Sequence, residues 1–198
     1  MKQSVGAKPL TFPASIWVIG IYDMNGKPNA MTVAWAEIYC SNPPCISISL
    51  RKATYSYACI VENRAFTVSI PSEEYLRQAD YFGIASRRDG YKFEAACLMP
   101  VRSELVPAPY VGEFPVVIEC KLLHTLEIGL HTLFIGEIRD IEVDESVFDE
   151  KGNSDIEIIR PVIYNPGNRD YYGIGCKLGK AFSIGKERRI KNKEDIWR

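Results

Sequence analysis

The stretch SLRKATYS, residues 49–56, combines the residue types that bind an anion. A strand-like run ends in two cations, Arg51 and Lys52, and the hydroxyls of Thr54 and Ser56 follow where a helix is expected to begin. Free N–H groups at a helix N-terminus, hydroxyl donors and nearby cations together suit a phosphate monoester. The same residues also describe a capped surface helix with two solvated cations, so both interpretations stay open at this point.

Two cysteines, Cys40 and Cys45, flank Ser-Asn-Pro-Pro and raise the question of a metal or redox pair. A structural zinc site needs four ligands, usually as two close pairs, and the sequence has no second close pair. A disulfide is geometrically possible across the turn, but a reducing cytosol does not favour it. We therefore expect a turn between two strands with both thiols packed, and most of the six cysteines as small core side chains.

The two histidines, His124 and His131, belong to no recognisable catalytic motif. The sequence contains neither G-x-S-x-G nor H-E-x-x-H. No G-x-G-x-x-G follows a strand-like run, which argues against a Rossmann dinucleotide-binding unit. A histidine on a strand is more often a hydrogen-bonded structural residue than a catalyst.

The elements that must position these residues are mainly strands. Asn25-Gly26 predicts a hairpin turn between two of them. Predicted strands cover residues 16–22, 29–37, 45–50, 65–70, 114–123 and 131–143, with weaker candidates at 161–164 and 171–176. Predicted helices run from Thr54 through Ile60, from Ser72 to about Phe82, and around 91–97. Strands outnumber helices, so we expect a mainly β, antiparallel barrel with a few covering helices rather than a parallel α/β sheet.

The composition is typical of one globular domain spanning residues 1–198. The chain is 46% hydrophobic and 25% charged with a net charge of −1, so no global field favours nucleic acid or an anionic membrane. The N-terminus lacks an apolar signal region, and we expect a cytoplasmic protein. The locally basic residues 186–198 are interpreted as a solvated C-terminal extension or a partner contact.

Seven segments in order resemble the flavin reductase-like, FMN-binding split-barrel family, and within it the flavoredoxins. They begin with the Asn-Gly hairpin and continue with NAMTVAW, SISLRKATYS, VENRAFTVSIP, ADYFGIASRRDGYKF, GLHTLFIGEI and YYGIGCKLGKAF, and the Pro-Pro turn lies between NAMTVAW and SISLRKATYS. The resemblance covers about residues 5–185. It implies a six-stranded Greek-key split barrel and a homodimer in which each subunit holds one FMN noncovalently near the interface.

The resemblance also implies which residues hold the cofactor. The strand before the Pro-Pro turn would pass along the flavin, where backbone N–H groups can donate to the ring and tune its potential, and Trp35 would lie beside the ring. The segment already interpreted as an anion site would bind the phosphate, with Lys92 and Ser86 in reach. The predicted cofactor-binding residues are Asn29, Met31, Thr32, Val33, Ala34, Trp35, Ser49, Leu50, Arg51, Lys52, Thr54, Tyr55, Ser56, Ser86 and Lys92.

The sequence departs from the family at two positions that bear on activity. Leu130 stands where many of these reductases have an acidic residue before the histidine, and Tyr91 stands where the family often has Asp. His131 is the candidate catalytic residue that would help place a nicotinamide, and it lacks that acidic neighbour. Three functions remain open: an electron carrier that exchanges electrons with a partner protein, an NAD(P)H:flavin oxidoreductase, and a flavin-binding sensory module.

Overall fold

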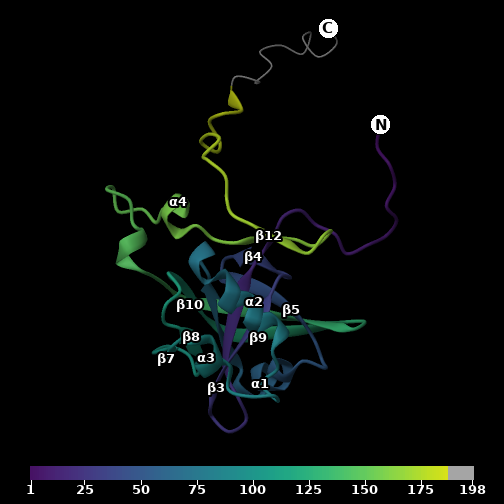
Figure 1. The fold of residues 1–198 in the computed structure, drawn as a ribbon, viewed down its shortest axis with the longest axis vertical. Coiled ribbons are helices and arrows are strands. Elements are labelled where there is room, and N and C mark those ends of the chain that lie inside the picture. Colours follow the sequence, from purple (N-terminus) through teal and green to yellow (C-terminus); the bar gives the residue numbers. More distant parts are fainter. Residues whose placement is uncertain (187–198) are drawn as a thin grey trace.

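The computed structural model describes residues 1–186 (Figure 1). Its main element is one seven-stranded sheet in the order β3-β2-β6-β9-β10-β5-β4, and every pairing in it is antiparallel. The strands are β2 (Trp17–Tyr22), β3 (Pro28–Val33), β4 (Ala36–Ser41), β5 (Pro44–Arg51), β6 (Ala65–Ile70), β9 (Val116–Ile128) and β10 (His131–Val143).

The two edge strands of this sheet follow one another along the chain. β3 ends at Val33 and β4 begins at Ala36, so the link Ala34–Trp35 connects opposite edges of the sheet. A sheet whose edges are joined by two residues must curl until those edges lie close together. The backbone N–H of Ser49 donates to the carbonyl of Trp35 at 2.9 Å, but β3 and β4 do not pair. The barrel is therefore split, which confirms the predicted mainly β split-barrel fold.

The six main predicted strands all occur in this sheet, but the predicted arm 29–37 was wrong as a single strand. Val33 pairs with Trp17 of β2, whereas Ala36 pairs with Ile48 of β5 on the other side of the split. The chain has to change partner between these positions, and this breaks the ladder. The sheet accordingly has seven strands where six were expected.

Short helices and two smaller sheets cover the barrel. The helices are α1 (Tyr55–Asn63), η1 (Glu73–Tyr75), α2 (Leu76–Ile84), α3 (Lys92–Ala96), η2 (Glu145–Val147) and α4 (Ile156–Ile159), which confirms the three predicted helices. β1 (Ala14–Ser15) pairs with β11 (Ile163–Asn165), which pairs with β12 (Asp170–Tyr172), while β7 (Pro100–Arg102) pairs with β8 (Pro109–Val111). The two weak strand candidates thus exist, although they are shorter than expected. No helix among residues 1–186 is long and apolar enough to cross a membrane.

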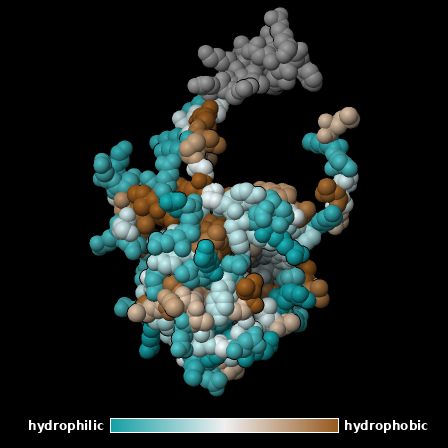
Figure 2. Space-filling view, viewed as in Figure 1, coloured by the Kyte–Doolittle hydropathy of each residue, from teal (hydrophilic) through white to brown (hydrophobic). Residues whose placement is uncertain are grey.

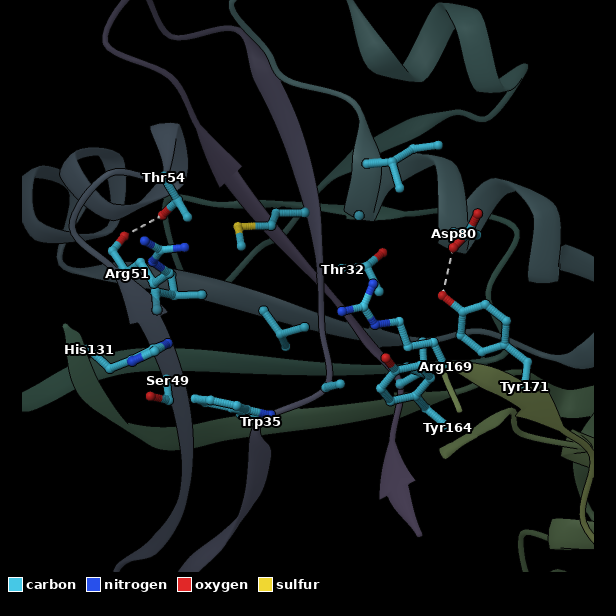
Figure 3. A pocket seen from close by; sticks show the side chains of 17 residues that line it. Thr32, Trp35, Ser49, Arg51, Thr54, Asp80, His131, Tyr164, Arg169 and Tyr171 are labelled. Carbon is cyan, nitrogen blue, oxygen red and sulfur yellow. Dashed lines mark hydrogen bonds between the residues drawn. The ribbon is translucent and has the colours of Figure 1, made fainter. Parts of the chain in front are cut away.

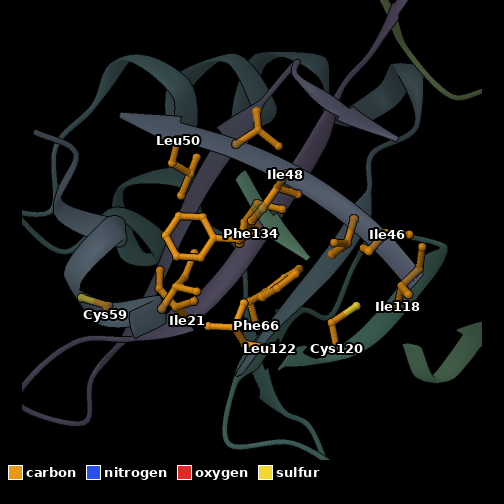
Figure 4. Close-up of a cluster of buried hydrophobic side chains, with 14 residues drawn as sticks. Ile21, Ile46, Ile48, Leu50, Cys59, Phe66, Ile118, Cys120, Leu122 and Phe134 are labelled. Atoms are coloured by element: carbon orange, nitrogen blue, oxygen red, sulfur yellow. The ribbon is translucent and has the colours of Figure 1, made fainter. Parts of the chain in front are cut away.

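The main core fills the space inside the curled sheet beneath α1 (Figure 4). Phe66 and Phe134 are both fully buried there, together with Ile48 and Leu50 of β5. Gly136 of β10 is required by this packing, because a Cβ at that position would lie 2.6 Å from the ring of Phe66. The small polar side chain of Ser47 on β5 is also covered, since it is only 2% exposed.

The two ends of the described chain extend from the same side of the body (Figure 1). Residues 173–186, here called the C-terminal arm, leave the body after β12 without forming a strand. Apart from Lys186, the predicted basic extension 186–198 lies outside the described residues.

Candidate functional site

A cavity of about 520 Å³ opens where the barrel is split (Figure 3). One wall is the end of β3 with the link Ala34–Trp35, and the end of β5 and the start of β10 add Arg51 and His131. Helix α2 contributes Asp80 and Gly83 on the opposite side. Because the chain changes partner at the link, its N–H groups are not used by the sheet: no backbone hydrogen bond of the described residues involves the N–H of Ala34 or Trp35.

A second cavity of about 210 Å³ continues from the first, and Met31, Thr54, Gly83 and Ile84 line both. Its walls are the first turn of α1 and the segment that follows α2. Thr54 is the residue before α1, but its hydroxyl donates to the carbonyl of Arg51 at 2.9 Å instead of capping the helix. The N–H of Tyr57 donates to the carbonyl of Thr54 at 3.3 Å, but the N–H groups of Tyr55 and Ser56, at the start of this nine-residue helix, have no backbone acceptor among the described residues.

The small cavity holds polar groups that the described chain does not satisfy. Asn29 is 1% exposed, and its Nδ2 donates to Ser56 Oγ at 3.3 Å, but its Oδ1 has no partner. Arg87 pairs with the buried Asp23 at 3.1 Å, yet its Nε is also unpartnered. Buried polar atoms are normally hydrogen-bonded. An acceptor and a donor without partners are consistent with a ligand that carries both hydroxyl and anionic oxygens.

Lys92 is a buried cation in the same cavity. Its side chain is 3% exposed, and its Nζ donates to the carbonyls of Phe82 and Ala85 at 3.1 Å each, near the C-terminal end of α2. It forms no ion pair with a carboxylate of the described residues. Burial lowers the pKa of Lys92 to about 8, because desolvation disfavours the ammonium form. A bound anion would supply the missing negative charge.

The large cavity is mainly apolar and aromatic at its other end. Trp35 packs against His131 with ring centroids 4.7 Å apart and an interplanar angle of 38°. Trp35 is 44% exposed, so one side of this pair remains open. The hydroxyl of Thr32 donates to the carbonyl of Ala79, which fixes β3 against α2. A flat, partly exposed aromatic surface beside free backbone N–H groups suits a planar heteroaromatic ring.

All but one of the predicted site residues line these two cavities. Met31, Thr32, Val33, Ala34, Trp35, Ser49, Leu50, Arg51, Thr54 and His131 line the larger one, and Asn29, Tyr55, Ser56, Ser86 and Lys92 line the smaller one. Lys52 is the exception. Its side chain is 55% exposed and its Nζ lies 2.7 Å from Glu127 of β9, outside both linings. Arg51 and Lys52 point in different directions because they are neighbours at the end of a strand.

Other lining residues were missed from the sequence. Arg87 and Arg88 line the small cavity, and the Arg-Arg pair within ADYFGIASRRDGYKF was a signal that could have found them. Tyr171 of β12 donates to Asp80 of α2 at 2.6 Å and closes one side of the large cavity, next to Arg169. Burial, followed by this hydrogen bond, raises the pKa of Tyr171. No local sequence pattern indicated Asp80, Arg169 or Tyr171 as site residues, because only the tertiary fold brings the β11–β12 hairpin next to α2.

The cysteines of the described residues are all free thiols. Cys40 and Cys45 face one another across the β4–β5 hairpin, and all six thiols are free. Cys45, Cys59 and Cys120 are buried as expected, but Cys40 is only half-buried and Cys97 and Cys176 are exposed, so fewer thiols lie in the core than expected. No group of three or more metal-ligating side chains occurs in residues 1–186. The Pro-Pro turn between two strands is confirmed.

Comparison with solved structures agrees with this geometry. The structure matches flavoredoxin of Desulfovibrio vulgaris (Miyazaki F) with a TM-score of 0.90 and 53% identity, covering 94% of this chain and 100% of the other. It matches flavoredoxin from Methanosarcina acetivorans with a TM-score of 0.85 and 26% identity, covering 95% and 98%.

Sequence comparison gives the same picture. An uncharacterised protein of Bacillus subtilis is 29% identical over 185 residues, which is 87% of each chain. A ferric-chelate reductase (NAD(P)H) of Archaeoglobus fulgidus is 31% identical over 104 residues, 52% of this chain and 60% of the relative. The model of the flavin reductase like domain matches residues 10–173, which include the sheet and both cavities. The chain therefore belongs to the flavin reductase-like domain family.

Proposed function

We propose that this protein is an FMN-binding electron-transfer protein of the flavoredoxin type. The observation that carries the proposal is the joined pair of cavities, which has cationic and hydroxyl groups in the small cavity and aromatic groups with free backbone N–H in the large one. The 53% identity to a flavoredoxin across that whole chain supports the same assignment. When bound, FMN supplies the one- and two-electron chemistry that the side chains lack.

The residues fit the phosphate and ribityl parts of FMN at the small cavity. The unpartnered Arg87 Nε–H, the ammonium of Lys92 and the first N–H groups of α1 are donors suited to a phosphate. The unpartnered Asn29 Oδ1 is an acceptor suited to a ribityl hydroxyl. Thr54 lines both cavities, and Arg51, three residues before it, lines the larger one.

In the large cavity the chain's contribution is positional and electrostatic. Trp35 and His131 present an aromatic surface, and the N–H groups of Ala34 and Trp35 are available to donate to ring heteroatoms. Donors at such positions stabilise negative charge on a reduced flavin and so raise its potential. Thr32, held by its bond to Ala79, keeps this wall fixed.

An NAD(P)H:flavin oxidoreductase is the second candidate function. The placement of His131 in the lining of the large cavity, in tilted contact with the partly exposed Trp35, favours it, because a nicotinamide would need an accessible flavin face. A relative of the chain is named as a ferric-chelate reductase (NAD(P)H). In this alternative His131 orients the nicotinamide. Leu130, which is 72% exposed, provides no acidic partner for it.

Anaerobic stopped-flow mixing of the yellow protein with NADH, NADPH and a reduced ferredoxin separates the two functions. A carrier is expected to bleach slowly with both nucleotides and rapidly with the protein donor. Fast bleaching by a nucleotide, at turnover rates, would establish the reductase instead. A protein that purifies colourless and takes up no FMN on titration would overturn both.

FMN titration of two neighbouring variants tests the phosphate end. Arg51→Ala should weaken binding by about tenfold to a hundredfold, since a charge-assisted contact contributes about 1.5–3 kcal/mol. Lys52→Ala is the matched control, because its ammonium pairs with Glu127 outside both cavities, and its affinity should stay unchanged. Equal losses in both variants would mean that the phosphate binds elsewhere on this surface.

We further propose that the single domain works as a homodimer in the cytoplasm, with a redox protein or NAD(P)H as electron donor. The free state of all six cysteines supports a reducing compartment. The resemblance to the family supports the dimer, with each flavin near the subunit interface.

A further inference from the structure

The C-terminal arm, residues 173–186, is exposed along its whole length except at Ile174. Leu178, Phe182 and Ile184 are 89%, 98% and 66% exposed. The arm is tied to the body by a hydrogen bond from the N–H of Lys177 to Glu157 near its start, and it then leads away from the body (Figures 1 and 2). Apolar side chains contribute to stability only when they are buried, so a surface that covered these three would stabilise the arm.

An apolar groove of about 430 Å³ lies at the base of the same arm. We call it the isoleucine groove, because its lining includes Ile70, Ile141, Ile156, Ile159, Ile163 and Ile174. Hydrophobic side chains also gather on the surface around α4 (Figure 2). Ile156 of α4 is 56% exposed and Ile141 of β10 is 48% exposed, so the described chain leaves this groove partly uncovered.

The charges of the arm and of the groove are opposite. Residues 173–186 contain three lysines and no acidic residue. Residues 140–157, which supply Ile141, Val143, Ser154 and Ile156 to the groove, contain eight acidic residues and one lysine. A basic apolar segment and an acidic apolar groove are complementary, and such complementarity selects one docking arrangement over others.

The arm is long enough to reach a neighbouring molecule. Fourteen extended residues span up to about 46 Å, whereas a body of this size has a radius of gyration of about 15 Å. The 14 residues of the arm and the ten other groove residues that are not buried give 24 residues per chain. A standard protein interface takes about 20–30 residues a side, so reciprocal docking would supply a complete interface.

We propose that two copies of this chain exchange their C-terminal arms, each arm docking in the isoleucine groove of the other copy. The arrangement is a two-fold, self-complementary interface in which every arm and every groove is used. It specifies the surface of the homodimer and is independent of whether FMN is bound.

The first test measures mass. The wild-type protein should sediment at twice its 22.4 kDa at micromolar concentration. Leu178→Asp with Phe182→Asp should raise the dimer dissociation constant by at least about a hundredfold, because two apolar side chains lose their burial and two anions face an acidic groove. Met24→Asp with Leu105→Asp is the matched control, since these residues are 62% and 59% exposed elsewhere on the body. An arm variant that keeps the wild-type constant would overturn the proposal, even if the protein is a dimer.

The second test locates the arm by crosslinking, in chains whose Cys40, Cys97 and Cys176 are replaced by serine. One chain carries Ser183→Cys in the arm and the other Ser154→Cys at the groove. A short bis-maleimide should join the two chains efficiently only when they are mixed. If a chain with both cysteines instead crosslinks within itself at all dilutions, the arm folds back on its own groove and the exchange is refuted. The flavin absorbance of every sample is recorded, so a failure of the proposed function is seen separately.

Discussion

The buried ammonium of Lys92 should make the stability of the flavin-free protein rise with pH in a way that a neutral replacement removes. An ordinary lysine has a pKa of 10.5, and burial lowers that of Lys92 to about 8. Below pH 8 both the folded and the unfolded chain carry the proton, so the desolvation cost is fully present. Between pH 8 and 10.5 the unfolded chain holds a proton that the folded one has released, and the free energy of unfolding therefore increases.

The size of this increase in the free energy of unfolding follows from the difference between the two pKa values of Lys92, 10.5 in the unfolded chain and about 8 in the folded one. At about 1.36 kcal/mol per unit the full difference is about 3 kcal/mol, of which about 2.5 kcal/mol should develop between pH 7 and pH 10. Lys92→Met removes this dependence, at the cost of two unsatisfied carbonyls that are the same at every pH. Other groups titrate in both proteins and cancel in the comparison.

Urea unfolding of flavin-free wild type and Lys92→Met, followed by tryptophan fluorescence from pH 7 to 10, measures this difference. The wild type should gain about 2.5 kcal/mol relative to the variant. Lys121→Met, at an exposed lysine of β9, is the control and should show no pH-dependent difference. A wild-type-minus-variant difference that stays constant over this range would refute the assignment of Lys92 as a desolvated cation. With saturating FMN the rise should flatten, because a bound phosphate keeps Lys92 protonated.

Three further outcomes are expected. Cys40→Ser with Cys45→Ser should keep its flavin and its rate of electron transfer, measured by absorbance and stopped flow, and loss of rate with flavin retained would restore the redox-pair hypothesis. Gly136→Ala should lower the free energy of unfolding by about 1–3 kcal/mol in urea titration, because its methyl group meets the buried ring of Phe66. Lys52→Met should leave that free energy close to the wild-type value, since its ion pair is exposed, and a clear loss in the same titration would show that the pair is structural.

The sequence predicted the strands best where the hydrophobic pattern was long and uninterrupted. The strand 131–143 was predicted with the bounds that the structure has, because it runs beside β9 along its whole length, although that ladder shifts register twice and β5 pairs only with its first half. The segment 29–37 was merged into one strand because its apolar and β-forming residues run without a turn signal. The first half of this segment pairs with β2 and the second half with β5, because the sheet curls between them. A local sequence pattern carries no information on how the sheet closes.

The site shows the same division. Arg51, Thr54 and Ser56 were predicted as an anion site from local chemistry, since a strand end followed by a helix start places them together in any fold. Their neighbour Lys52 was included in the predicted site because of its charge. Adjacent side chains at the end of a strand point in different directions, and Lys52 forms an ion pair with Glu127 of β9 instead. That pairing exists only because β9 and β10 form a hairpin beside the end of β5.

The sequence by itself therefore determined the mainly β class, the position of the turns and the chemical types at the cofactor site. The tertiary structure decided where the barrel opens, which residues wall the opening and which charges remain unpaired. Asp80 and Tyr171 meet across 91 residues, and no periodicity or spacing encodes such a contact. Local propensity acts between neighbours in sequence, whereas burial and charge pairing act between neighbours in space.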